Sequence, residues 1–123
     1  MEGSEDMNES WVIKNSPFEM LDIAFKKLFP NVKYNAYFEV ELEDESGETV
    51  YGFTNFEDNG EITILVDGNL SVYNATEIFA HELAHAAVGE EHDHDEVWKK
   101  AFGDLFDEYN RIGGVLFEKE VSQ

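Results

Sequence analysis

The 123-residue sequence predicts a single domain of the α+β class. Near both ends of the chain, apolar residues recur every three to four positions, as on one face of a helix. In the middle they alternate with polar residues, which is typical of strands with one buried face. Residues 78–88 are apolar on almost all sides, as in a helix buried in a core. We therefore expect an N-terminal helix, a three-stranded antiparallel sheet, the buried helix and a C-terminal helix.

The first helix is preceded by an acidic segment without apolar periodicity. We expect residues 1–10 to form a disordered tail and residues 11–123 to form the folded domain. Ser16-Pro17-Phe18-Glu19 predicts the helix start, with a capping serine, a proline in the first turn and the glutamate of a capping box. The helix is expected to end before Pro30, after an apolar stripe of Leu21, Ala24, Phe25 and Leu28.

Two strands are predicted at residues 36–42 and 49–56, where apolar and polar side chains alternate. The acidic segment 43–48 between them predicts a turn, so we expect the two strands to pair as an antiparallel hairpin. Gly52 lies inside the second strand, where a glycine indicates a bulge or the close approach of another part of the chain.

A third strand is predicted at residues 61–66, after the turn sequence Asp58-Asn59-Gly60. Because this strand directly precedes the buried helix, two alternatives stay open. It is either an internal strand of the sheet or a strand whose free edge could pair with an extended peptide. Residues 74–77 resemble a capping box and are expected to begin the buried helix, which Gly89 ends.

The last helix is predicted at residues 97–112, which carry a wide apolar stripe at helical spacing. The pair Gly113-Gly114 is expected to end it, because glycine is a poor helix former. The sequence leaves open whether residues 115–121 then form a short strand or an ordered tail.

The buried helix contains the motif His81-Glu82-Leu83-Ala84-His85. Residues four apart share one face of a helix, so both imidazoles can approach one ion, with Glu82 beside it. This is the H-E-x-x-H arrangement of zinc peptidases, in which the glutamate acts as base on a metal-bound water. Burying these three polar side chains unpaired would cost free energy that a metal ion would offset. The alternative is a chance match, with ordinary core histidines.

The composition restricts both metal ligands and partners. Without cysteine, the chain can hold a metal only through histidines and carboxylates. Its net charge of −20, from 28 acidic and 8 basic residues, disfavours direct contact with nucleic acid. The sequence shows neither a signal-peptide pattern nor an apolar run of about 20 residues that could span a bilayer. We therefore expect a cytoplasmic protein without membrane contact, as a monomer or weak dimer.

A catalytic zinc site usually has three protein ligands and one open position. His92 and His94 are both candidates for the third ligand. The carboxylate candidates are Glu90, Glu91, Asp93, Asp95, Glu96, Asp104 and Glu108. Because the last helix must fold back on the buried helix, a residue just before its apolar stripe can reach the ion. His94 lies one turn before Trp98, an anchor in that stripe, and fits this geometry better than His92.

The run from His81 to Gly89, followed by residues 92–98, resembles the SprT-like zinc metallopeptidases, including small phage and prokaryotic members. The likeness covers about a fifth of the chain, residues 77–102. In that family the third ligand is a histidine four residues before an aromatic residue of the next helix, as His94 is before Trp98. The resemblance thus implies a minimal zincin-like fold in which His81, His85 and His94 bind Zn²⁺ and Glu82 is the base.

The chain also departs from parts of that family and has a rival resemblance. DNA-associated SprT-like members carry additional nucleic-acid-binding segments, which this sequence does not show. The minigluzincins share the small size and the H-E-x-x-H helix, but they use a glutamate as third ligand. Glu108 would be the leading candidate for that role here.

These observations predict a zinc metalloendopeptidase that hydrolyses peptide bonds in a protein or peptide substrate, through Glu82-assisted attack of zinc-bound water. The acidic surroundings favour a basic substrate segment. The alternative is a non-catalytic or latent metal-binding module whose cleft is covered by the C-terminal tail or by a dimer partner.

Overall fold

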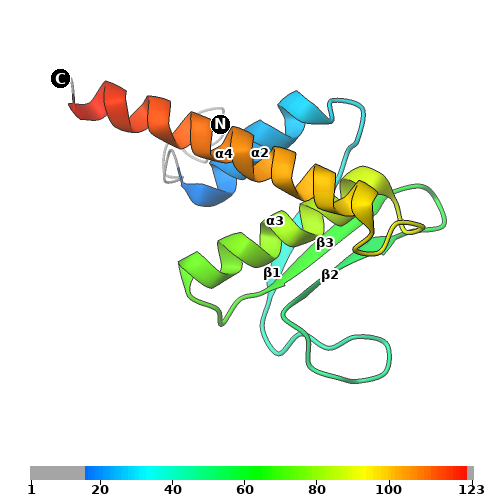
Figure 1. Ribbon diagram of the computed structural model, residues 1–123. Helices are drawn as coiled ribbons and strands as arrows, with labels where there is room; N and C mark the ends of the chain where they lie inside the picture. Colours follow the sequence, from blue (N-terminus) through cyan, green and yellow to red (C-terminus); the bar gives the residue numbers. More distant parts are fainter. Residues whose placement is uncertain (1–15, 122–123) are drawn as a thin grey trace, which may run out of the picture.

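The computed structural model describes residues 16–121 and confirms the α+β class. The elements follow in the order α2 (Pro17–Leu28), β1 (Asn35–Glu39), β2 (Gly52–Phe56), β3 (Ile62–Asp67), α3 (Val72–Val88) and α4 (Glu96–Val121) (Figure 1). The acidic tail expected at residues 1–10, and the expected start of the domain at residue 11, lie outside the described residues.

The sheet is mixed, and the predicted antiparallel hairpin is wrong. The strand order is β1-β3-β2, with β1 parallel and β2 antiparallel to β3. The chain does reverse in the predicted turn, where Glu43 and Thr49 form an isolated bridge, but it then diverges to opposite sides of β3. The physical reason lies in β3 itself, because its apolar side chains Ile64 and Val66 are buried and a central position suits the most apolar strand.

Helix α3 lies in the middle of the molecule, between the sheet and the layer that α2 and α4 form (Figure 1). It contacts β2 and β3 on one side and the other two helices on the other. The predicted burial of this helix is therefore confirmed. The main core cluster contains the fully buried side chains of Leu21, Phe25, Ile64, Leu83 and Leu105.

The predicted start of α3 is one turn too late. The helix begins at Val72, and the side chain of its N-cap Ser71 accepts a hydrogen bond from the backbone N–H of Asn74. Its predicted end is confirmed, because Gly89 follows the last helical residue with a φ of 93°, in the left-handed region that favours glycine. Ser16 likewise caps α2 as predicted, by accepting from the N–H of Glu19.

Helix α4 continues past Gly113-Gly114 to Val121, so the predicted stop is wrong. A glycine inside a helix costs only about 1 kcal/mol relative to alanine, which weakens a helix without ending it. The 26 residues of α4 span about 39 Å at ~1.5 Å per residue. Residues 115–121 thus form the end of α4 farthest from the α3–α4 connection, rather than a strand or a separate tail (Figure 1).

Candidate metal centre

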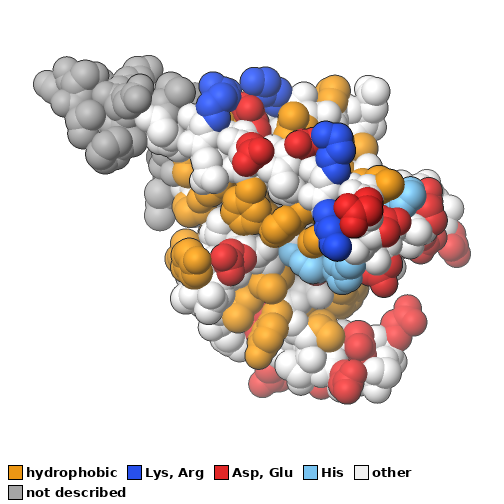
Figure 2. All heavy atoms as spheres, in the orientation of Figure 1, with side chains coloured by type: hydrophobic (Ala, Val, Ile, Leu, Met, Phe, Trp, Pro, Cys, Tyr) orange, Lys and Arg blue, Asp and Glu red, His pale blue; other side chains and the backbone are white. Residues whose placement is uncertain are grey.

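Three histidine side chains converge at the C-terminal half of α3. His81 and His85 lie one turn apart on that helix, and His94 comes from the connection to α4. Their Nε2 atoms form a triangle: His81 to His85 is 3.3 Å, His85 to His94 is 3.1 Å, and His81 to His94 is 2.9 Å. The histidine side chains reach the molecular surface (Figure 2). The structure thus brings together the three histidines that the sequence analysis singled out.

This arrangement fits a metal ion. Three nitrogens that bind a tetrahedral Zn²⁺ at roughly 2.0–2.1 Å would lie about 3.3 Å from one another, close to the spacing of this triangle. Each ring nitrogen carries either a proton or a lone pair, so three that face one point cannot all hydrogen-bond to one another. A cation at that point accepts all three lone pairs. These three side chains therefore lie close enough to bind one metal ion.

The surroundings keep two of the three imidazoles neutral. Burial, together with the neighbouring His85 and His94, lowers the pKa of His81 to about 4. Burial and His94 likewise lower the pKa of His85. At neutral pH both rings are therefore unprotonated, as metal ligation requires, because protons and metal ions compete for the same nitrogens.

The connection between α3 and α4 fixes the position of His94. His94 has a φ of 60°, in the left-handed region, where histidine occurs more often than most residues with a Cβ atom. Asp95 caps α4 by accepting a hydrogen bond from the backbone N–H of Trp98 at 3.0 Å. The buried Trp98 ring packs against the three imidazoles, with centroid distances of 4.8 Å to His81, 5.4 Å to His85 and 4.7 Å to His94.

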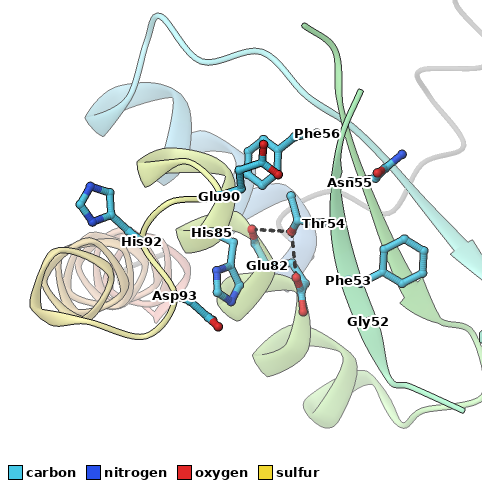
Figure 3. Close-up of a pocket in the computed structure, with 10 residues that line it drawn as sticks. All are labelled: Gly52, Phe53, Thr54, Asn55, Phe56, Glu82, His85, Glu90, His92 and Asp93. Atoms are coloured by element: carbon cyan, nitrogen blue, oxygen red, sulfur yellow. Dashed lines mark hydrogen bonds between the residues drawn. The ribbon is translucent and has the colours of Figure 1, made fainter. Parts of the chain in front are cut away.

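Glu82 is buried beside the triangle, with only 6% of its surface exposed. Its Oε1 accepts a hydrogen bond from the Thr54 hydroxyl of β2 at 2.8 Å (Figure 3). Burial raises the pKa of Glu82 to about 7, against the opposing effect of the Thr54 hydrogen bond. A divalent cation on the neighbouring histidines would further favour the ionised carboxylate. Burial thus brings the pKa of Glu82 close to neutrality, and a bound cation would shift the carboxylate toward the ionised form that accepts a proton.

A cavity of about 400 Å³ opens beside these residues (Figure 3). It is lined by the five residues of β2, by Glu82 and His85 of α3, and by Glu90, His92 and Asp93 of the α3–α4 connection. The strand at the cavity is therefore β2, which lies at an edge of the sheet. The free edge considered for residues 61–66 does not exist, because β3 pairs on both sides and is the internal strand.

The other proposed ligands lie elsewhere or have other partners. His92 lines the cavity, but its Nδ1 lies 2.8 Å from Asp95 Oδ2 and it does not join the triangle. Glu108 accepts hydrogen bonds from Lys27 of α2 and Arg111 of α4. Asp93 contacts one of the three histidines rather than the centre of the triangle, because its Oδ1 lies 3.2 Å from Nδ1 of His94.

Sequence reasoning did not identify the contribution of β2 to this site. Thr54 carries no motif, and only Gly52 gave a signal, as a glycine inside a strand. A Cβ atom on Gly52 would lie 2.6 Å from Cγ2 of Ile78 and 3.0 Å from the carbonyl oxygen of Leu65. The predicted close approach is thus confirmed, and it is to the helix that carries Glu82.

Comparisons of this chain with models of protein families, with characterised proteins and with solved structures gave no match. The likeness to SprT-like peptidases therefore stays a prediction from the motif and its spacing. None of the helices within residues 16–121 combines the length and the apolar character needed to cross a bilayer.

Proposed function

We propose that this protein is a zinc-dependent metalloendopeptidase. The observation that carries the proposal is the triangle of Nε2 atoms, 2.9–3.3 Å apart, beside a buried glutamate that lines an open cavity. A metal triad alone would serve a structural site equally well. The buried Glu82 with a pKa near neutrality and the cavity at its side are what a hydrolytic site requires in addition.

The donor set favours zinc. Three neutral imidazoles without a thiolate are a common set for catalytic Zn²⁺, with the fourth position left for water or substrate. His81, His85 and His94 would hold the ion. Zinc bound there would lower the pKa of a water molecule and polarise a substrate carbonyl.

Glu82 would perform the proton transfers. Its carboxylate would accept the proton of the attacking water and then donate that proton to the amine that leaves when the peptide bond breaks. Both transfers need a group whose pKa lies near the working pH, and burial brings Glu82 into that range. The hydrogen bond from Thr54 keeps one carboxylate oxygen engaged, which leaves the other for this proton.

The cavity suggests how a polypeptide would bind. Among residues 16–121, strand β2 pairs with β3 on one side only, so its other edge can pair with an extended peptide. Glu90 and Asp93 face β2 across the cavity (Figure 3), and the sequence contains no lysine or arginine between Lys33 and Lys99. The negative potential of these surroundings would favour a substrate segment that carries lysine or arginine.

Among zinc peptidases, the position of His94 relative to Trp98 supports membership of the SprT-like family. His94 stands four residues before the aromatic anchor Trp98, whose ring contacts all three imidazoles. The rival minigluzincin reading needs Glu108 at the metal, but that side chain is engaged by Lys27 and Arg111. The described part of α4 runs away from the α3–α4 connection, which carries His94, so residues 96–121 do not cover the cavity in this conformation (Figure 1).

The test compares Glu82→Gln with the wild type and with Glu77→Gln, a matched change at an exposed position of the same helix. Zinc-loaded proteins are incubated with an unfolded lysine-rich polypeptide and with a glutamate-rich one, and cleavage is followed by mass spectrometry. We expect Glu82→Gln to lose at least roughly a hundred-fold in rate while it keeps one zinc per chain, because general-base catalysis contributes about that much or more. Glu77→Gln should behave as the wild type.

Full activity of Glu82→Gln would contradict the assignment of the base. A wild type that binds one zinc and cleaves neither polypeptide would instead support the alternative, a metal-binding module without catalysis.

A further inference from the structure

Thr54 joins the edge strand of the cavity to the glutamate beside the histidine triangle. Its hydroxyl lies 2.8 Å from Glu82 Oε1 and 3.0 Å from the backbone carbonyl oxygen of Glu82 (Figure 3). The two residues are 28 positions apart in the sequence, on β2 and α3. This is a tertiary contact between the strand that lines the cavity and the proposed base.

The contact depends on a close approach of β2 to α3 at Gly52. Gly52, two residues before Thr54 and on the same face of the strand, has no room for a Cβ atom. The nearest atoms to such a Cβ belong to Ile78, Leu65 and Glu82 itself, with the Glu82 Cγ at 3.5 Å. The missing side chain at Gly52 therefore lets β2 approach α3 closely enough for the Thr54 hydroxyl to reach the Glu82 carboxylate.

We propose that Thr54 is a positioning residue for Glu82, an inference that rests on the proposed peptidase function. The single hydroxyl proton of Thr54 faces both Oε1, at 2.8 Å, and the backbone carbonyl oxygen of Glu82, at 3.0 Å. The shorter contact to Oε1 fixes the rotation of the carboxylate and leaves Oε2 as the oxygen that exchanges the proton. Because β2 also lines the cavity with all five of its residues, a peptide paired to this edge acts on the strand that holds the base. Thr54 thereby connects the strand that lines the cavity to the side chain of the proposed base.

A valine at position 54 has nearly the shape of threonine but cannot donate a hydrogen bond, whereas a serine keeps the hydroxyl. We therefore compare Thr54→Val and Thr54→Ser with the wild type in the zinc-loaded protein. The matched control is Thr63→Val, because the Thr63 hydroxyl also donates to a carboxylate, Glu57 Oε2 at 3.0 Å, on the exposed part of the sheet. Zinc content and steady-state kinetics on a cleaved peptide are measured for all four proteins.

We expect Thr54→Val to lower kcat roughly ten- to a hundred-fold, the range for a lost hydrogen bond to a charged group. The KM of Thr54→Val should stay within about two-fold of the wild-type value, and the variant should still bind one zinc per chain. The reason is that the hydroxyl orients the base and binds neither substrate nor metal. Thr54→Ser should recover most of kcat, and Thr63→Val should match the wild type. A kcat unchanged in Thr54→Val, or a serine variant as impaired as the valine variant, would overturn the inference.

A measurement that does not require catalysis tests this inference separately from the proposed peptidase function. In protein labelled with ¹³C at the glutamate carboxyl carbon, the Glu82 signal is assigned by its loss in Glu82→Gln. We expect Thr54→Val to shift that signal and Thr63→Val to leave it in place. If the wild type cleaves no peptide, the peptidase proposal fails, yet this signal still decides whether Thr54 holds the carboxylate. An unshifted signal in Thr54→Val overturns the positioning role.

Discussion

Asp93 Oδ1 lies 3.2 Å from Nδ1 of His94, on the side of the imidazole ring away from Nε2. The Nε2 atom of the same ring faces His81 and His85. A carboxylate in this place favours the proton on Nδ1, which leaves the lone pair on Nε2 for a metal ion. An acidic residue of the α3–α4 connection thus selects the tautomer that the triangle needs.

Replacing Asp93 by asparagine should weaken zinc binding by about ten-fold, at the lower end of the range for residues that orient a metal ligand, because the pair is exposed to solvent. Glu91→Gln removes the same charge from the same connection and serves as the control. Competition with a chelator of known affinity measures both variants. An equal loss of zinc affinity in Asp93→Asn and Glu91→Gln would mean that Asp93 acts only through its charge.

The choice of the third ligand predicts opposite results for two neighbouring histidines. His94→Ala should lower the zinc affinity by roughly a hundred-fold or more, because two imidazoles remain where a zinc site uses at least three protein ligands. His92→Ala should keep one zinc per chain, since His92 lies 2.8 Å from Asp95 and outside the triangle. Metal analysis after dialysis measures both. Loss of zinc from His92→Ala with retention in His94→Ala would reverse the assignment.

The contact between β2 and α3 predicts a glycine requirement at position 52. Gly52→Ala should lower the free energy of unfolding by about 1–3 kcal/mol, the usual cost of an added methyl group in a packed interior. Its Cβ would lie 2.6 Å from Ile78 Cγ2 and must displace the strand or the helix. Gly103→Ala in α4 is the control: no side chain of the described part of the protein lies within 4 Å of its added Cβ, so it should be neutral or stabilising by up to about 1 kcal/mol. Urea denaturation compares the two.

The lowered pKa of Glu108 predicts that the stability of the folded protein depends on pH. Hydrogen bonds from Arg111 and Lys27 lower its pKa to about 2, below the 4.5 expected in an unfolded chain. A lowered pKa stabilises the folded state above the unfolded value, and this contribution disappears as the pH falls through the folded value. Glu108→Gln should therefore unfold more easily than the wild type at pH 7, with a difference that shrinks between about pH 4.5 and 2.

The measurement is thermal unfolding in the presence of a chelator, so that metal loss at low pH does not contribute. Asp107→Asn, at the adjacent exposed position of α4, is the control and should show a smaller difference at pH 7. A difference between Glu108→Gln and the wild type that is independent of pH would show that packing, not ionisation, is lost.

Much of the candidate site could be predicted because it is local. The spacing of His81 and His85 puts both on one helix face whatever surrounds the helix, and the apolar neighbours predicted its burial. Ser16 and Gly89 marked helix ends through short-range capping, and both predictions are confirmed. One prediction failed at a choice between two local alternatives, because the N-cap of α3 is Ser71 rather than a residue three positions later.

The sequence by itself determined the class of the fold, the buried H-E-x-x-H helix and a short set of candidates for the third ligand. Only the tertiary structure decided that β3 inserts between β1 and β2, that His94 rather than His92 or Glu108 completes the triangle, and that Thr54 meets Glu82. The reason is physical: periodicity and capping act over about one helical turn. Strand order and cross-element contacts depend instead on which buried surfaces pack best once the whole chain has folded.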